Sequence, residues 1–288
     1  MFNRNLSILI FIFLSVFDFF VWHSVVAGKP NKNLEVYFLN VGQGDSQLAI
    51  LPGGVKVLID GGPNNKVISE LSSIFQPTDR YIDLAVMSHP QYDHFAGLID
   101  VLKRYEVGAF IYNGRRGEIK AFDELENVLK EKNVNKIILV QGDKIKYGGS
   151  RFDILSPDNN FLQSKELNDT CLVMGLTAEN NGNGKLLKVL FTGDIGANIE
   201  KYLADNFDIN VDVLKVAHHG SKYSSSEEFL KKARPKISVI EVGKNTYGHP
   251  TKKALDNLAS IGSQIFRTDQ NDTLKLVFDG GKINVFKK

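Results

Sequence analysis

Short apolar runs alternate with amphipathic stretches along most of the chain. The runs 82–86, 186–191 and 211–217 are typical of buried strands, since they are short and rich in Leu, Ile and Val. The stretches 66–75 and 95–104 repeat apolar residues every three or four positions, which is typical of amphipathic helices. The alternation predicts an α/β (α+β) chain in which helices cover the outer face of a sheet.

Turn residues mark two hairpins in this pattern. Pro52-Gly53-Gly54 predicts a hairpin between the strands 47–51 and 55–59. The polar segment 179–184, which is rich in Asn and Gly, predicts the tip of a later hairpin. The second half of the chain is therefore expected to be mostly strand until the helices near its end.

The N-terminal segment has a different pattern, because Leu6 to Ala27 is almost wholly apolar. It is long enough to cross a bilayer as one helix, although Asp18 near its centre costs about 2.5–3.5 kcal/mol on insertion scales. The ending Val25-Val26-Ala27 also suits a signal peptidase. We expect residues 1–28 to be a retained anchor or a cleaved signal, the third interpretation being a mis-started chain. Both favoured interpretations place 34–288 outside the cytoplasm, either membrane-anchored or secreted.

Composition narrows the class of protein only a little. The 288 residues are 43% hydrophobic and 24% charged, which is ordinary for a globular chain. The balance of 35 Lys and Arg against 33 Asp and Glu gives no strong electrostatic footprint for nucleic acid. A nucleic-acid site would therefore have to be a local basic groove. The single cysteine, Cys171, excludes an internal disulfide framework.

Two imidazoles and a carboxylate, His89, Asp93 and His94, follow the apolar run 82–86. They lie on a predicted strand-to-helix turn, and the carboxyl ends of strands are where α/β sheets place their ligands. Neutral imidazole binds zinc, manganese or iron, and a carboxylate beside it can hold a second ion or a water. Taken alone, the string fits a loop whose imidazoles cap helix ends equally well.

Further carboxylates and imidazoles follow other predicted strands. Asp60 either orients a metal-binding histidine or forms a plain Asx turn. Asp194 follows the run 186–191, where a carboxylate can bridge two ions that lower the pKa of a shared water. The pair His218-His219 is hard to explain by packing, because buried imidazoles need partners. His249 comes at one more strand end.

Seven motifs, taken in order, resemble the metallo-β-lactamase superfamily and, in more detail, the C-terminal hydrolase domain of ComEC-type competence proteins, which take up DNA. The resemblance covers 34–288 and is carried by Asn40-Val41-Gly42-Gln43-Gly44-Asp45, Leu58-Ile59-Asp60-Gly61-Gly62, Ser88-His89-Pro90 with Asp93-His94, Phe191-Thr192-Gly193-Asp194, Lys215-Val216-Ala217-His218-His219-Gly220-Ser221, Tyr247-Gly248-His249-Pro250 and Arg267-Thr268-Asp269. It implies a four-layer αββα sandwich of two mixed sheets, with the metal site at one edge. In this chain one N-terminal apolar helix precedes it, and no channel domain is encoded.

The resemblance also implies a set of site residues. Metal ligands would be His89, Asp93, His94, Asp194 and His218, and Asp45, Asp60 and Gln91 would support them. The chain departs from the superfamily at Gln91, where histidine is usual, and near 168–171, where a further histidine has no counterpart. We therefore expect one firm divalent ion, Zn²⁺ or Mn²⁺, and a second, weaker ion held by His89 and Asp194 with Gln91 or Asp169.

These observations favour a metal-dependent phosphodiesterase that cleaves DNA outside the cytoplasm. Asp93 and Asp194 would be catalytic through the metal, and His219 or His249 would protonate the leaving oxygen or clamp the phosphate.

A helix start rich in Ser and Lys can cradle phosphate, so Ser221 and Lys222 would contact a flanking phosphate, although such a start is more often only a cap. The expected partners are DNA or another phosphodiester, and the membrane through the N-terminal segment. No obligate protein partner is inferred.

Two alternatives stay open, since fold does not fix function. One is an exported hydrolase of another ester, a lactone or a β-lactam, and the near-neutral charge favours it slightly. The other is a non-catalytic phosphate-binding module with a degraded metal site. Gln91 supports it, whereas the intact Asp93, His94, Asp194 and His218 oppose it.

Overall fold

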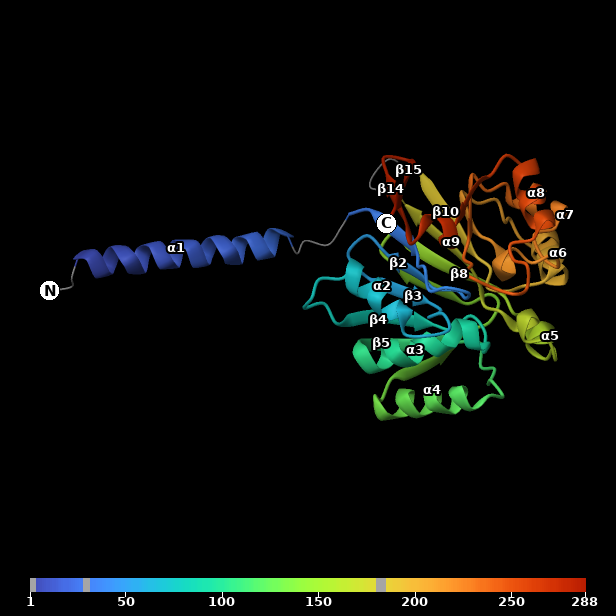
Figure 1. Cartoon of the computed structure of the whole chain (residues 1–288), viewed down its shortest axis with the longest axis horizontal. Helices are drawn as coiled ribbons and strands as arrows, with labels where there is room; N and C mark the ends of the chain where they lie inside the picture. Colours follow the sequence, from blue (N-terminus) through green and yellow to red (C-terminus); the bar gives the residue numbers. More distant parts are fainter. Residues whose placement is uncertain (1–3, 28–31, 180–184) are drawn as a thin grey trace.

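The computed structural model describes residues 4–27, 32–179 and 185–288. It confirms the expected αββα arrangement, in which two mixed sheets pack face to face and helices cover both outer faces (Figure 1). Within the described ranges the first sheet has eight strands, in the spatial order β15 (Lys282–Lys287), β14 (Leu274–Asp279), β1 (Leu34–Phe38), β2 (Gln47–Ile50), β3 (Lys56–Ile59), β4 (Tyr81–Val86), β5 (Glu106–Tyr112) and β6 (Asn135–Ile138).

The described part of the second sheet has seven strands and lies against the first. Their spatial order is β13 (Gln264–Arg267), β12 (Ile237–Ile240), β11 (Val213–Lys215), β10 (Leu186–Phe191), β9 (Val173–Glu179), β8 (Ser150–Ser156) and β7 (Lys144–Tyr147). The hairpin tip expected between β9 and β10 lies largely outside the described residues.

Apolar side chains fill the space between the sheets and the space under each helical layer. Phe191 lies at the centre of the inter-sheet core, with ring centroids 6.5 Å from Phe38 and 6.4 Å from Phe152. Helices with one apolar face cover the sheets because that face must be buried. They are α2 (Lys66–Ile74), α3 (Tyr92–Arg104) and α4 (Lys120–Glu131) on the first sheet, and α6 (Ala197–Asn206), α7 (Glu227–Ala233) and α8 (Lys252–Ser260) on the second.

Short helical turns fill several connections. They are α5 (Asn159–Leu162), η1 (Leu167–Thr170), η2 (Ala217–Gly220) and α9 (Thr268–Asn271). The turn η2 matters for the site, because it follows β11 directly and carries the adjacent histidines His218 and His219.

Parallel pairing gathers the polar strand ends at one edge of the sandwich. β3, β4 and β5 run parallel in the first sheet, so Asp60 and His89 leave it on the same side. β10, β11 and β12 run parallel in the second sheet, so Asp194 and His219 leave it on the same side as well. The expectation that the strand ends build one site is therefore met by the topology.

The helix α3 is held against the end of β3 by backbone contact. The Gly61 N–H donates to the His94 carbonyl at 2.7 Å, and the Gly97 N–H donates to the Gly62 carbonyl at 2.9 Å. A Cβ on Gly97 would lie 2.0 Å from the Gly61 oxygen, so only glycine allows this approach. The first turn of α3, with Asp93 and His94, is positioned by this contact.

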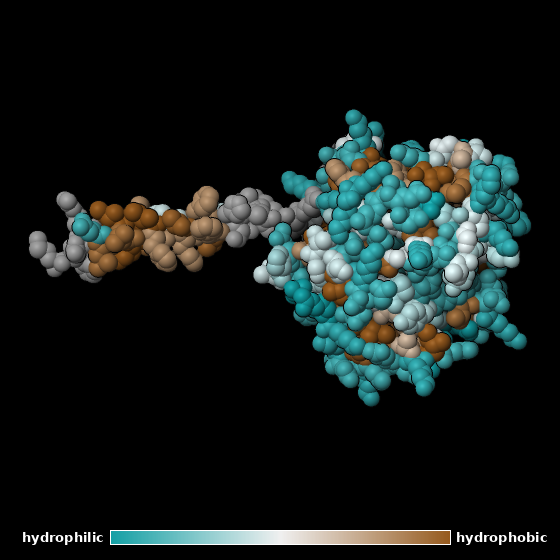
Figure 2. All heavy atoms as spheres, in the orientation of Figure 1, coloured by the Kyte–Doolittle hydropathy of each residue, from teal (hydrophilic) through white to brown (hydrophobic). Residues whose placement is uncertain are grey.

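The N-terminal helix α1 (Arg4–Ala27) stands apart from the sandwich, and most of its coloured surface in Figure 2 is brown. Its segment Asn5–Trp22 has a mean hydropathy of 2.1, and its large apolar side chains are exposed. The helix is long and apolar enough to cross a membrane, and a signal sequence passes the same test. Residues 1–3 and 28 of the expected 1–28 segment lie outside the described residues, and the choice between anchor and signal stays a prediction.

The contact between α3 and β3 predicts that replacing Gly97 by alanine destabilises the protein, although this change normally stabilises a helix. Replacing Gly by Ala inside a helix normally stabilises it by about 1 kcal/mol, whereas Gly97→Ala should lower the free energy of unfolding by roughly 1–3 kcal/mol because the added methyl overpacks the contact. Chemical denaturation followed by circular dichroism measures the change. Gly175→Ala is the matched control, since its Cβ would meet only Leu155 Cδ1 at 3.7 Å. Wild-type stability in Gly97→Ala would contradict the packing argument.

Candidate metal centre

Four side chains from three elements bring potential metal-ligating atoms within 4.8 Å of one another. They are Asp93 and His94 in the first turn of α3, Asp194 after β10, and His219 in η2. Asp194 Oδ2 lies 3.3 Å from His94 Nε2 and 3.4 Å from His219 Nε2. Asp93 Oδ2 lies 3.4 Å from the same nitrogen of His219. We call these four residues the ligand cluster.

Hydrogen bonds behind the ligand cluster fix the orientation of its imidazoles. Asp60 Oδ2 lies 2.8 Å from His94 Nδ1, and Asp60 itself accepts from the Ser88 N–H at 2.7 Å and from the Ser88 hydroxyl at 2.6 Å. His219 Nδ1 lies 2.8 Å from the Glu241 carbonyl oxygen. Both rings therefore turn Nε2 toward Asp194, the arrangement by which outer partners orient metal-binding histidines.

The backbone is strained where it delivers these side chains. His218, His219 and Asp60 have φ angles of 50°, 53° and 58°, in the left-handed region that costs of order 1–3 kcal/mol for such residues. The His218 N–H donates to the Gly193 carbonyl at 3.2 Å, and the Ser221 N–H donates to the His218 carbonyl at 2.9 Å. These bonds hold the turn in which His219 enters the ligand cluster.

His218, which the sequence analysis expected as a ligand, lies beside the ligand cluster, and His219 occupies the place within it. His218 Nε2 is 3.8 Å from Asp194 Oδ2, and its side chain is 29% exposed. Its Nδ1 lies 3.3 Å from the amide nitrogen of Asn168, whose oxygen accepts from Gln91 Nε2 at 2.5 Å. Gln91 is therefore paired with another amide.

His89 lies next to the ligand cluster in a fully buried position. Its ring centroid is 4.2 Å from that of His94, and its Nδ1 lies 3.0 Å from the Ser88 hydroxyl. Burial and the neighbouring His94 charge lower the pKa of His89 to about 3, so the imidazole is neutral, as a metal ligand must be. Asp169, expected as an alternative donor, accepts from Ser164 and Asn198 at 2.8 Å each.

Several buried polar atoms in this region have no hydrogen-bond partner in the described structure. They are the Nε2 atoms of three histidines and both carboxylate oxygens of an aspartate: His89, His94, His219 and Asp194. A buried polar atom without a partner costs about 1–3 kcal/mol. Imidazole nitrogen and carboxylate oxygen suit Zn²⁺ and Mn²⁺ alike. The donors therefore fit a divalent cation but do not select one metal.

Charge coupling sets the protonation of the ligand cluster. Burial alone raises the pKa of Asp194, yet the charges of His219 and His94 hold that pKa well below its usual range. Burial alone lowers the pKa of His219, yet Asp194 and Asp45 raise it to about 10. The pKa of Asp93, which burial would raise, falls to about 2 because of the neighbouring His219, whose Nε2 lies 3.4 Å away, and the charge of His94. Protons on the histidines thus balance the carboxylates, and a bound cation would displace them.

Sequence reasoning assigned no role to Lys215, the last residue of β11. Its side chain is fully buried, and Nζ contacts Asp45 Oδ2, donates to the Gly193 carbonyl at 2.9 Å and lies 3.6 Å from Asp194 Oδ1. Burial lowers the lysine pKa, but Asp45 and Asp194 raise it above its usual value. A lysine inside an apolar strand is the signal from which a buried ion pair could have been predicted.

Glu241 is a further buried carboxyl group next to Asp45 and Lys215. It accepts from the Ser46 N–H at 3.0 Å and from the Gln47 side-chain amide. Burial and the negative charge of Asp45 raise the Glu241 pKa well above its ordinary value, although Lys215 opposes this shift. Lys215 is therefore the cation that lies in contact with Asp45.

An open cavity of about 380 Å³ lies over the ligand cluster. Its described lining is Gln43, Gln91, Tyr92, Asp93, Asp194, His218, His219, Tyr247 and His249. His249 thus faces the cluster as expected, 5.6 Å from His218 between ring centroids. Ser221 and Lys222, the expected phosphate contacts, lie outside this lining: Ser221 is buried, and Lys222 Nζ lies 4.9 Å from the ring centroid of Tyr223.

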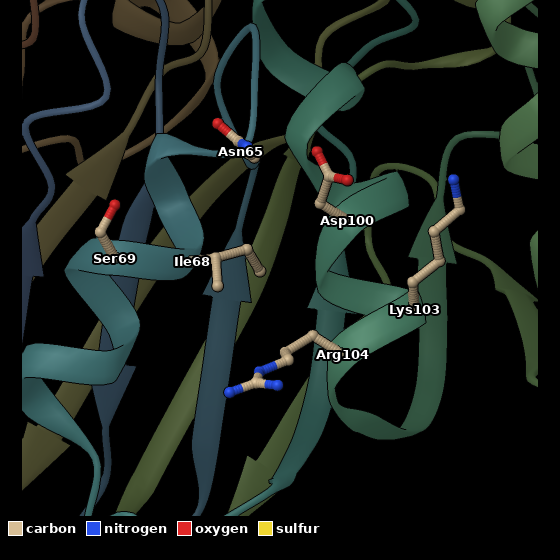
Figure 3. A pocket seen from close by; sticks show the side chains of 6 residues that line it. All are labelled: Asn65, Ile68, Ser69, Asp100, Lys103 and Arg104. Carbon is tan, nitrogen blue, oxygen red and sulfur yellow. The ribbon is translucent and has the colours of Figure 1, made fainter.

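A larger hollow, of about 490 Å³, lies between α2 and α3 (Figure 3). Arg104 points from α3 toward α2 there, whereas Lys103 projects from the other side of α3 and pairs with Glu124 at 2.6 Å. The six described lining residues include one carboxylate, Asp100, and no imidazole. This hollow therefore lacks the donor set found under the smaller cavity.

The buried pair predicts a large loss of stability when its cation is removed. Lys215→Met should lower the free energy of unfolding by about 3–5 kcal/mol, because Asp45 then stays charged and unpaired in the interior. Chemical denaturation measures the loss. Lys188→Met, which breaks an exposed pair with Asp208, is the control and should cost less than about 1 kcal/mol. Equal losses in both variants would show that Lys215 carries no buried charge balance.

Comparisons with known proteins show what this chain is similar to. No family model matches the chain. Over 261 residues it is 30% identical to ComE operon protein 3 of Bacillus subtilis (strain 168), covering 84% of this chain and 32% of that protein. Over 262 residues it is 26% identical to Recombination protein 2 of Haemophilus influenzae (strain ATCC 51907 / DSM 11121 / KW20 / Rd), covering 89% and 30%. The chain thus spans about a third of the length of the curated relatives it matches.

Solved structures with the same arrangement of layers include the metallo-beta-lactamase fold protein YhfI from Bacillus subtilis. It matches with a TM-score of 0.55 at 12% identity, over 84% of this chain and 99% of that chain. This likeness shows that the chain has the metallo-β-lactamase fold. Over most of its length the chain is also similar to a part of ComE operon protein 3 and of Recombination protein 2, which agrees with the resemblance to ComEC-type proteins that its motifs indicate.

Proposed function

We propose that the chain is a metal-dependent phosphodiesterase that cleaves DNA outside the cytoplasm. The observation that carries the proposal is the ligand cluster, three of whose residues, Asp93, Asp194 and His219, line an open cavity. The relatives named for a competence operon and for recombination support DNA as the substrate. The apolar helix α1 supports an exported domain, held at the membrane or released from it.

Asp93, His94, Asp194 and His219 would hold the firm cation, and His89 with Asp194 would be the donors nearest a second, weaker one. When bound, a divalent cation supplies Lewis-acid activation of water and of the phosphoryl oxygens. Asp60 and the Glu241 carbonyl keep His94 and His219 oriented for this purpose. Two of the four proposed ligands are therefore held in place by hydrogen bonds to other parts of the fold.

The remaining imidazoles in the cavity provide proton chemistry. His249 and His218 lie outside the ligand cluster and line the same cavity, so either reaches a phosphoryl group seated there. We assign protonation of the leaving oxygen to His249, because His218 is tied to Asn168 through Nδ1. Lys222, which is exposed and lies two residues after η2, remains the proposed contact for a flanking phosphate.

A specific observation favours a second candidate, an exported hydrolase of a small ester. The described lining of the cavity contains no Lys or Arg, whereas DNA-binding proteins normally neutralise several phosphates. Cleavage of a bis-aryl phosphodiester without cleavage of DNA would select this candidate. A protein that holds no metal and cleaves neither substrate would instead be a non-catalytic binding module.

Removing the shared carboxylate should abolish metal binding and activity together. Asp194→Asn should reduce DNA cleavage by roughly 10³-fold or more, because the substitution removes charge from the centre of the ligand cluster. In the wild type, metal at 100 times its Kd should add about 2.7 kcal/mol of stability. Metal content by mass spectrometry, the melting temperature with and without chelator, and cleavage of labelled DNA test these expectations. Wild-type cleavage by Asp194→Asn would overturn the proposed function.

Substitutions of the adjacent histidines His218 and His219 should give different metal contents and activities in the same assays. His219→Gln should lose metal and activity, because its Nε2 lies within the ligand cluster. His218→Gln should keep near-stoichiometric metal, because glutamine retains a hydrogen-bonding group beside Asn168. The reverse result, with metal lost only in His218→Gln, would restore His218 as the ligand.

A further inference from the structure

Two exposed tyrosines stand on the rim of the cavity above the ligand cluster. Tyr92, in α3 on the side of the first sheet, is 51% exposed, and Tyr247, in the loop after β12 of the second sheet, is 73% exposed. Both line the cavity that contains Asp93 and Asp194. One tyrosine ring from each sheet's side of the fold therefore borders the place where a phosphodiester would be cleaved.

Local contacts restrict both rings although neither is buried. Tyr92 packs edge-on against Phe95, with ring centroids 6.2 Å apart and an interplanar angle of 76°. The ring of Tyr247 is tilted by 30° to that of His249, with ring centroids 5.8 Å apart. Asn245 fixes the loop, since its Oδ1 accepts from the Tyr247 and His249 N–H groups at 3.1 Å each. Such restriction lowers the entropy lost when a ligand stacks on the rings.

The chemistry of the lining indicates what these rings bind. Phosphate backbones are usually gripped by Lys and Arg, which the described lining lacks. Aromatic rings beside a phosphate-cleaving centre are instead suited to flat, apolar groups, and nucleobases stack on tyrosine regardless of sequence. The cavity volume of about 380 Å³ matches a ligand of small-molecule size rather than a duplex.

We propose that Tyr92 and Tyr247 stack on unpaired bases that flank the cleaved phosphate, so that the site selects single-stranded DNA or frayed ends over duplex. The proposal rests on the proposed phosphodiesterase function. A base that stacks on protein must leave its neighbours in the duplex, which costs free energy that a single strand does not pay. The tyrosines are thus specificity residues and are separate from the ligand cluster.

The test compares strands that differ only in their bases. A labelled single-stranded oligonucleotide, the same sequence as a blunt duplex, and a strand of equal length built from abasic residues are incubated with Mn²⁺-loaded full-length protein. The wild type should cleave the base-bearing strand with a kcat/KM roughly 10- to 100-fold higher than that for the abasic strand. Cleavage of the duplex should be slower than that of the single strand.

Leucine variants assign this preference to the two rings. Tyr92→Leu and Tyr247→Leu should each lose roughly 5- to 100-fold on the base-bearing strand while changing cleavage of the abasic strand less than about threefold. Tyr81→Leu is the matched control, because Tyr81 is 41% exposed but lies at the start of β4, far along the strand from His89. It should leave both rates unchanged. Metal content and melting temperature establish that each variant is folded and loaded.

The outcomes separate the two proposals. Equal cleavage of base-bearing and abasic strands by the wild type would overturn base stacking and leave the phosphodiesterase function standing. Variants that slow both strands equally would also overturn it, because the tyrosines would then act on the ligand cluster and not on bases. A metal-loaded wild type that cleaves no strand would refute the proposed function and this inference together.

Discussion

The balance of buried charge at the junction of the two sheets is the constraint on which the site depends. Three carboxylates, Asp45, Asp60 and Asp194, are almost completely removed from water there. Lys215 and the imidazoles of His94 and His219 offset them at contact distance. Because an uncompensated charge in such a place costs several kcal/mol, the strand ends that carry these groups must stay in register.

The same constraint links metal binding to the fold. Burial lowers the pKa of His94, but the charges of Asp194, Asp60 and Asp45 raise it well above its usual value. A divalent cation competes with these protons for the same carboxylate charge, so it binds in exchange for protons and not as a simple addition. Lys215 lies outside the ligand cluster, and although burial lowers its pKa, Asp45 and Asp194 hold that pKa above the usual value for lysine, so its charge remains when the cation arrives.

Sequence reasoning captured the parts of this protein that depend on local order. Apolar runs and turn residues predicted the strands, and polar residues at strand ends predicted the edge at which Asp60, His94 and Asp194 meet. Sequence order could not tell which of His218 and His219 lies within the ligand cluster, because left-handed backbone angles determine where these adjacent side chains lie. Lys215 was missed because its role depends on Asp45, which is distant in sequence and becomes its neighbour only when β11 packs beside the loop before β2.

The number of cations that the site can hold follows from which donors are already engaged. Gln91 and Asn168 bond to each other, and Asp169 is occupied by Ser164 and Asn198. Among the described residues, the buried donors nearest a second ion are His89 and the shared Asp194, which are fewer than the three protein ligands typical of a catalytic zinc site. Metals of the magnesium type, in contrast, bind through one or two carboxylates plus substrate phosphate. At such a pair of donors, a second cation would need the phosphate of the substrate as an additional ligand.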